Sequence, residues 1–301
     1  MSKPQLGLLV GDNAFHGISH LSQQRARERS LTDNPSNKEY ATKLVNLSLQ
    51  NGANGFMFSV SDTTLSILKG LDHRKKPDLY AIVPYAYEYV RLATQVGGIS
   101  GLAKQISRQI MLSRNIFSVA PNLIGFLRFN PSAFLKTYLV YEISRIKSSA
   151  GNDANLKSVL LHEVITDMAL GLNLDWFFKS YIEFFSKSKI RPGFETRNFP
   201  YLIKKLNEWQ IGLENIAVTA SFNKAGFQMN SSQVDCENAL IAASGAQIIA
   251  MSILASGYLK PAEAIPYISN LPTISQIVVG VSNERQAYET FNLLSTRLRL
   301  A

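Results

Sequence analysis

The chain of 301 residues contains little cysteine, tryptophan or histidine: one, two and four residues respectively. A single cysteine excludes a disulfide within the chain, which is typical of proteins from a reducing compartment. Two carboxylates flank Cys236 and disfavour its thiolate, so we interpret this cysteine as structural. The first apolar run, at residues 6–10, is too short for a signal peptide, and no run reaches the roughly 18 apolar residues of a membrane span. We therefore expect a cytoplasmic protein.

Acidic residues are scarce in one part of the chain. The sequence has 31 basic and 22 acidic residues, a net charge of +9. Between residues 91 and 147, eight basic residues stand against Glu142 alone. Such a concentration marks a face that attracts anions, nucleic acid or an acidic membrane surface. No nucleic-acid-binding signature accompanies it, and a solvated basic helical face explains the pattern equally well.

Short apolar runs alternate with amphipathic stretches along the chain. The runs lie at residues 6–10, 55–60, 79–83, 158–161, 191–194, 215–220, 247–251 and 275–280, and helical patterns at 40–51, 174–186, 199–209, 232–243, 261–268 and 284–294. Unbroken apolar runs are typical of parallel strands that are buried on both faces. Eight strand–helix repeats predict an α/β fold, a single-domain (β/α)₈ TIM barrel over residues 1–301. An open doubly wound sheet is the alternative, but no GxGxxG follows an early strand.

One interval is much longer than a crossover helix requires. About 75 residues separate the third and fourth strands, and residues 95–153 are basic, aromatic and apolar. Pro121 and Pro131 divide this segment into short helices. We interpret it as a helical insertion that caps the barrel mouth as a lid or substrate wall. A contact between subunits and a peripheral membrane contact are the alternatives.

Polar residues follow nearly every predicted strand. In a barrel the active site lies at the carboxyl ends of the strands. The catalytic candidates are Asp12, His16, Tyr85, His162, Glu163 and Glu195, and the substrate-binding candidates are Asn13, Asp62, Arg197 and Asn223. The His162 imidazole follows an apolar strand, where it can act as acid, base or hydrogen-bond donor to an oxyanion. The alternative is a histidine whose hydrogen bonds are satisfied by a neighbouring strand.

A divalent metal is possible in this mouth but is not required by the spacing. His16 and His20 are four residues apart, yet Gly17 and Ile18 make a regular helix uncertain there and the HEXXH motif is absent. Carboxylates and imidazoles at the strand ends supply the donor types that such a metal uses. Because no ligand set is specified, we assign no metal ligands. Alternatively, Asp12, Asn13 and His16 shape the first loop or bind the substrate.

The last two strands carry the best candidate for an anion site. Ser252, Ser256, Gly257 and Lys260 follow the seventh strand, and Ser282, Asn283 and Arg285 open the helix after the eighth. Backbone N–H groups at a helix N-terminus bind phosphate, and barrels often place a phosphate between these two loops. The pattern predicts a phosphorylated cofactor or an anionic substrate. Ordinary helix capping is the alternative.

Residues 156–295 carry several short motifs in a characteristic order. They are Val159-Leu-Leu-His162, the stretch KSKIRPGFETRN that ends at Asn198, Thr219-Ala-Ser-Phe-Asn223, the run MSILASGYL from Met251, and Ile277-Val-Val-Gly-Val-Ser-Asn283 before a helix. This half of the chain resembles the aldo-keto reductase family. The resemblance implies a (β/α)₈ barrel and NADP as cofactor. It also implies that His162 orients a carbonyl, that Asn198 contacts the nicotinamide amide, and that Ser252, Ser282 and Arg285 lie near the cofactor phosphates.

The first half departs from the family's pattern. The family has an aspartate at the end of strand two, a tyrosine shortly after it and a lysine at the end of strand three. Here strand two ends at Phe58-Ser59 with Asp62 as the nearest acid, and strand three ends at Val83-Pro84-Tyr85. Tyr85 is a candidate for a relocated acid.

Three hypotheses about function follow. The first is a divergent NADP-dependent oxidoreductase that acts on a small carbonyl substrate. The second is a non-redox lyase, isomerase or hydrolase, with or without a metal, that uses the acidic, histidine-containing mouth. The third is a non-catalytic protein that binds a partner through residues 95–153.

Overall fold

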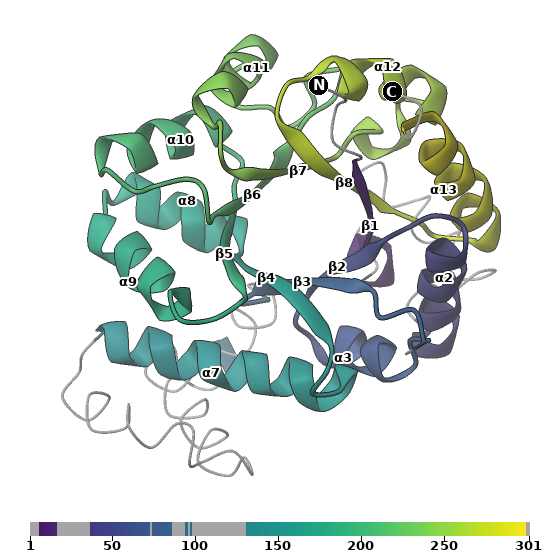
Figure 1. Cartoon of the computed structure of the whole chain (residues 1–301), viewed down its shortest axis with the longest axis horizontal. Helices are drawn as coiled ribbons and strands as arrows, with labels where there is room; N and C mark the ends of the chain where they lie inside the picture. Colours follow the sequence, from purple (N-terminus) through teal and green to yellow (C-terminus); the bar gives the residue numbers. More distant parts are fainter. Residues whose placement is uncertain are drawn as a thin grey trace.

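The computed structural model describes residues 6–16, 37–72, 74–85, 94–95, 97 and 131–298. Eight parallel strands form a closed barrel in the order β1 to β8, and β8 pairs with β1 (Figure 1). The strands are β1 Gly7–Gly11, β2 Gly55–Ser59, β3 Asp78–Val83, β4 Asn155–Leu161, β5 Arg191–Glu195, β6 Ala217–Ser221, β7 Gln247–Met251 and β8 Ile274–Gly280. The predicted (β/α)₈ barrel is confirmed.

Helices surround the barrel in the order of the sequence (Figure 1). They are η1 Asn13–His16, α2 Lys38–Gln50, α3 Asp62–Lys69, α7 Pro131–Ala150, α8 Glu163–Gly171, α9 Asp175–Phe185, α10 Phe199–Glu208, α11 Gln233–Ala242, η2 Ala255–Gly257, α12 Pro261–Asn270 and α13 Glu284–Leu298. Side-chain caps start several of them. Ser61, for example, accepts a hydrogen bond from the Thr64 N–H at the start of α3.

Two apolar layers hold the barrel together. The larger layer lies between strands and helices and includes Phe58, Val159, Phe178 and Phe194. The smaller layer fills the barrel interior with Leu9, Met57, Tyr80, Ile82, Leu160, Ile249 and Val278. Side chains that alternate along each strand supply both layers, which explains why the strand sequences are continuously apolar.

A polar layer fills the amino-terminal end of the barrel. The Tyr80 hydroxyl accepts hydrogen bonds from the side-chain amides of Gln276, at 2.7 Å, and Gln247, at 3.3 Å. Arg191 donates to the Gln247 side-chain oxygen at 2.5 Å. The interior is therefore packed at this end, and side chains at the carboxyl ends of the strands form the available mouth.

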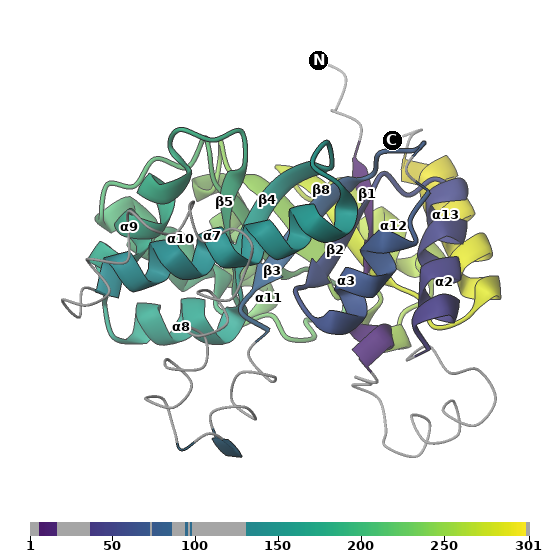
Figure 2. The same cartoon turned by 90° about the horizontal axis from the view of Figure 1, so that it is seen from below.

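The segment between β3 and β4 differs from its prediction. Residues 131–150 form α7, a continuous helix that packs against α3 and α9 in the outer ring of the barrel (Figure 2). Pro131 is the first residue of this helix, a position where its missing N–H costs nothing. The predicted range 95–153 for a cap over the mouth is thus too wide. Residues 96 and 98–130 lie outside the described part of the chain. No helix among the described residues is long and apolar enough to span a membrane.

Candidate active site

The ends of β1 and β3 bring three predicted residues together. Asp12 is buried, and its Oδ2 atom accepts a hydrogen bond from the Ser59 N–H at 2.7 Å. The same oxygen lies 3.0 Å from Nε2 of His16. The His16 ring stacks on Tyr85 with centroids 4.7 Å apart. Asp12 therefore fixes the first loop against β2 and orients the His16 imidazole.

His162 follows β4 and caps the N-terminus of α8. Its Nδ1 atom accepts a hydrogen bond from the Val164 N–H at 3.2 Å, so the neutral ring carries its proton on Nε2. Burial lowers the pKa of His162, and the charge of Arg197 lowers it further, although Glu163 and Asp12 oppose this. At neutral pH the residue is thus a neutral imidazole that can donate through Nε2–H.

Glu195 is the last residue of β5 and is almost completely buried. One carboxyl oxygen accepts a hydrogen bond from the Glu163 N–H at 3.2 Å. Burial, followed by the negative charge of Glu163, raises the pKa of Glu195 to about 8, and Asp12 contributes in the same direction. The charge of Asp12 thus acts on both Glu195 and His162. The three residues lie at the carboxyl ends of β1, β4 and β5, so they lie at the same rim of the barrel.

Arg197 links four strand ends through a chain of polar contacts. Its guanidinium binds both carboxylate oxygens of Glu163, with Nη2 3.1 Å from Oε1, and also contacts the side-chain oxygen of Gln228. The Gln228 oxygen in turn accepts from Ser252 Oγ at 3.5 Å, and Ser221 donates to Ser252 at 3.2 Å. The charge of Arg197 is therefore largely neutralised by Glu163. Gln228 lies in the loop after β6, where no sequence pattern indicates a role.

Asp167 is a second residue that the sequence analysis missed. Its carboxylate accepts hydrogen bonds from the Thr196 hydroxyl at 2.5 Å and from the Arg197 N–H at 3.0 Å. Burial raises the pKa of Asp167 despite these donors. Its position four residues after Glu163 places both carboxylates on one face of α8, which is the signal that could have found it. Asp167 fixes the turn that carries Arg197 and Asn198.

The residues proposed to bind a cofactor lie along the same side of the barrel. Asn198 is half-buried at the start of α10, and its side chain makes no capping hydrogen bond. At α13, Ser282 donates to the Gln286 side chain through both N–H and Oγ. Asn283 accepts from the Gln286 N–H at 2.9 Å, as the capping alternative predicts. Several donors of this helix N-terminus are thus already used.

Arg285 nevertheless remains suited to a phosphate. Its side chain is mostly exposed and, among the described residues, it pairs with Glu289 alone, one turn along α13, at 2.9 Å. An exposed ion pair of this kind contributes little to stability, so Arg285 can exchange its contact with Glu289 for one with a phosphate. The amide of Asn198 and the guanidinium of Arg285 are groups of the type that can bind a dinucleotide. The Ser252 hydroxyl already contacts Ser221 and Gln228, and the backbone of α13 contributes fewer donors than the sequence suggests.

Two predicted substrate-binding residues make other contacts, and a third is exposed. Asp62 pairs with Arg145 of α7 at 3.0 Å and is largely exposed. Asn223 uses both its amide nitrogen and its carbonyl oxygen on the backbone of Phe227, each at 2.8 Å. Asn13 is exposed at the start of η1. Their proposed role stays a prediction, and His20 lies outside the described residues.

The structure also shows the environment of Cys236 and tests for a group of residues that could bind a metal. The Cys236 thiol is buried and donates to the Asn230 carbonyl at 3.2 Å. Burial raises its pKa to about 11, and the neighbouring carboxylates add to this, which supports the structural interpretation. In the part of the chain that the structure describes, no group of three or more histidine, cysteine or acidic residues has the arrangement of a metal site.

Comparison with solved structures places the barrel among known folds. Two structures from Pseudomonas aeruginosa, each described as a "putative aldo-keto reductase", align over 98% of this chain. Their TM-scores are 0.56 and 0.55, with 12% and 13% identity and 92% and 91% of their own chains covered. The chain has the aldo-keto reductase fold.

A third structure supports the same assignment. It is MGS-M4, an aldo-keto reductase enzyme from a Medee basin deep-sea metagenome library. It aligns over 100% of this chain and 90% of its own, with a TM-score of 0.51 and 11% identity. No family model matches the sequence, and no curated protein matches it. The resemblance found in residues 156–295 is thus confirmed at the level of fold, over both halves of the chain.

Proposed function

We propose that this protein is an oxidoreductase of the aldo-keto reductase type that reduces the carbonyl group of a small substrate with NADPH. The observation that carries the proposal is the pair of proton donors at the mouth of this barrel. At neutral pH, Glu195 is largely protonated and His162 holds its proton on Nε2. Both groups can donate to a carbonyl oxygen that becomes negatively charged during the reaction.

Each residue of the mouth has a separate role in this reaction. When bound, the dinucleotide supplies a hydride for the carbonyl carbon. Glu195 gives its proton to the carbonyl oxygen, and the Nε2–H of His162 orients that oxygen and stabilises its charge. Glu163 and Asp167 hold Arg197 and the turn beside it in place. A carboxylic acid with a raised pKa thus replaces the tyrosine and lysine that the family uses.

The substrate of this site is best taken as uncharged. Asp12 and Glu163 lie at this rim, and Arg197, which is the arginine beside them among the described residues, is already paired with Glu163. An additional anion would meet the carboxyl groups of Asp12 and Glu163, and within the described part of the chain Arg197 is already engaged by Glu163. This argues against the anionic substrate that the sequence predicts, although a phosphate on the cofactor still fits Arg285.

A dinucleotide titration tests the proposal directly. Purified protein is titrated with NADPH and NADH by calorimetry, and aldehyde-dependent oxidation is then followed at the nicotinamide absorbance band. We expect saturable binding, and a roughly tenfold weaker NADPH affinity for Arg285→Ala, because one charge-assisted contact to phosphate is lost. Arg74→Ala is the matched control, since Arg74 forms a comparable exposed pair with Asp72 before β3. Absence of saturable binding of either dinucleotide at millimolar concentration rules out the proposal.

A specific observation favours a second candidate function. The Asp12–His16 pair and the protonated Glu195 place a base and an acid at one mouth, which is the requirement for an isomerase or lyase acting beside a carbonyl. Incubation with small α-hydroxycarbonyl compounds in deuterated water tests this by exchange of the α-proton. Exchange without any dinucleotide, lost in His16→Ala, supports this candidate over carbonyl reduction. If the α-proton does not exchange and reduction depends on a dinucleotide, the result supports carbonyl reduction.

A further inference from the structure

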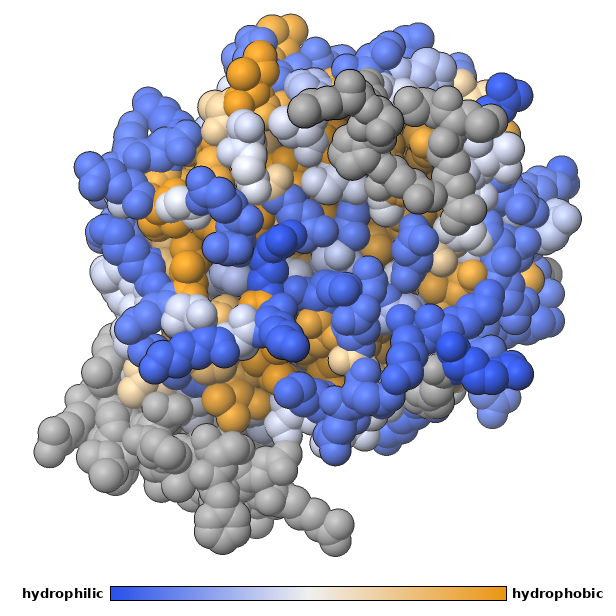
Figure 3. All heavy atoms as spheres, in the orientation of Figure 1, coloured by the Kyte–Doolittle hydropathy of each residue, from blue (hydrophilic) through white to orange (hydrophobic). Residues whose placement is uncertain are grey.

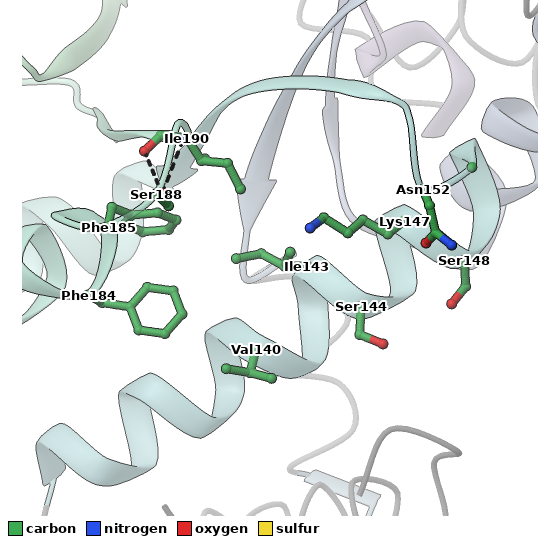
Figure 4. Close-up of a pocket in the computed structure, with 11 residues that line it drawn as sticks. Val140, Ile143, Ser144, Lys147, Ser148, Asn152, Phe184, Phe185, Ser188 and Ile190 are labelled. Carbon is green, nitrogen blue, oxygen red and sulfur yellow. Dashed lines mark hydrogen bonds between the residues drawn. The ribbon is translucent and has the colours of Figure 1, made fainter. Parts of the chain in front are cut away.

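A groove lies at the amino-terminal rim of the barrel, between α7 and α9 (Figure 4). Its volume is about 810 Å³, within the usual range of small-molecule sites. Its apolar wall consists of Val140, Ile143, Phe184, Phe185 and Ile190. The loops that precede β4 and β5 close one side of it. The groove is therefore at the opposite end of the strands from His162 and Glu195.

The surface around this groove is partly apolar. Figure 3 shows the same face as Figure 1, with apolar atoms exposed next to α7 among hydrophilic side chains. The wall residues of the groove are half-buried and not sealed in the core, apart from Phe185. An elongated apolar molecule can thus lie along α7 and exclude water from these side chains, which is favourable in proportion to the apolar area covered.

One cation points into this groove. Lys147 extends from α7 toward Ile143 and Ile190 (Figure 4). Its ammonium makes no ion pair or hydrogen bond with any other residue that the structure describes, and none of the described residues lining the groove is acidic. The neighbouring carboxylates of Asp153 and Glu183 pair elsewhere, with Lys76 and Lys136.

Hydroxyl and amide groups lie along the α7 edge of the groove, on the other side of Lys147 from its ammonium. Ser144, Ser148 and Asn152 line it beside Lys147 (Figure 4). The Lys147 ammonium reaches across the groove toward the apolar wall, and an ammonium without a counter-charge among the described residues is a partner for a carboxylate. The groove therefore presents an apolar wall with one cation beside it.

We propose that this groove binds a long-chain carboxylate, with the acid group at Lys147 and the alkyl chain along the apolar wall formed by α7 and α9. The proposal follows from charge complementarity. A neutral apolar ligand leaves the ammonium without a counter-charge, and a small anion leaves the wall exposed to water. It is independent of the chemistry at the mouth, because no residue of the groove belongs to that site.

Calorimetric titration of the full chain with sodium decanoate, below its micelle concentration, tests this proposal. We expect saturable binding for the wild type and at least a tenfold weaker affinity for Lys147→Glu, since attraction of the carboxylate becomes repulsion. Ile143→Glu is expected to abolish binding by placing a charge on the wall. Lys224→Glu is the matched control, because it makes the same charge change on an exposed lysine after β6, at the other rim.

Three outcomes overturn the proposal. The first is absence of saturable decanoate binding to the wild type, and the second is equal affinity for wild type and Lys147→Glu. The third is equally tight binding of 1-decanol, which has the chain without the charge. Either result leaves the proposed carbonyl reduction untouched, because dinucleotide-dependent activity is measured separately and is expected to be the same in Lys147→Glu and in wild type.

Discussion

Burial changes the proton chemistry of two residues at the rim of the barrel. Glu195 and His162 have ordinary side chains, but both are removed from water at the ends of β5 and β4. Desolvation disfavours the charged form of each, so it raises the pKa of the carboxyl group and lowers that of the imidazole. Both residues therefore hold their neutral, proton-donating forms at neutral pH.

Substitution of Glu195 tests its role as the acid. In Glu195→Gln the side chain keeps its shape but loses the transferable proton, so we expect kcat for carbonyl reduction to fall roughly 100-fold or more. In the wild type, kcat should decline as the pH rises through about 8, where Glu195 ionises. Steady-state rates between pH 5 and 10 measure both effects. A decline at pH 8 that persists in Glu195→Gln contradicts the assignment.

The same pKa also makes stability depend on pH. The pKa of Glu195 rises from its usual 4.5 to about 8 in the folded chain, so the folded state binds more protons than the unfolded state between these values. The stability that this group contributes is complete below pH 4.5 and is lost as the pH rises through 8. Urea midpoints across this range should show a smaller decline for Glu195→Gln than for wild type.

At the scale of elements, α8 holds the candidate site in shape. It begins at the cap provided by His162 and carries Glu163 and Asp167 on the face toward β5. Through these carboxylates it fixes Arg197 and the turn between β5 and α10. A single short helix thus determines the geometry of residues from three consecutive loops.

Removal of the Asp167 carboxylate tests this role of α8. Asp167→Ala leaves the Thr196 hydroxyl and the Arg197 N–H without their acceptor, and we expect a loss of about 2 kcal/mol in the free energy of unfolding. Asp167→Asn keeps one acceptor oxygen and should lose about half as much. Urea denaturation measures both variants. Asp175→Ala is the control, because Asp175 is an exposed residue paired with Lys179. If Asp175→Ala lowers the free energy of unfolding as much as Asp167→Ala does, the argument is contradicted.

The sequence predicted the strands, whose residues are buried along their whole length, better than the helices, which are buried on one face. The runs at 247–251 and 191–194 match β7 and β5 within one residue. By contrast, α3 and α8 were not predicted because each is short and follows its strand almost directly. The error at α7 has another cause. Pro131 was read as a break within an insertion, whereas it is the first residue of a helix in the barrel wall.

At the scale of the whole molecule, barrel closure depends on close contact between strands. An added Cβ atom at Gly55 would lie 2.2 Å from the Asp78 carbonyl oxygen on β3. Neither backbone can move away without opening the barrel between β2 and β3. Glycine at this position is therefore required by the packing of the strands.

Alanine substitutions at two glycines test this requirement. Gly55→Ala should destabilise the fold by about 3 kcal/mol or more, since the added methyl group overlaps backbone. Gly171→Ala is the matched control at the end of α8, where an added Cβ meets nothing within 4 Å. It should be neutral or slightly stabilising. Thermal unfolding followed by circular dichroism compares the two, and equal melting temperatures contradict the packing argument.

The sequence by itself determined the barrel, because eight apolar runs separated by amphipathic stretches bury their side chains in only a few architectures. It also identified Asp12, His162 and Glu195, since polar residues after such strands share one rim. Only the tertiary structure decided that Asp167 and Gln228 support Arg197, that Asn223 closes its own loop, and that burial raises the pKa of Glu195. Contacts between distant loops and the extent of burial arise when the barrel closes, so neither is encoded in the local pattern of any one segment.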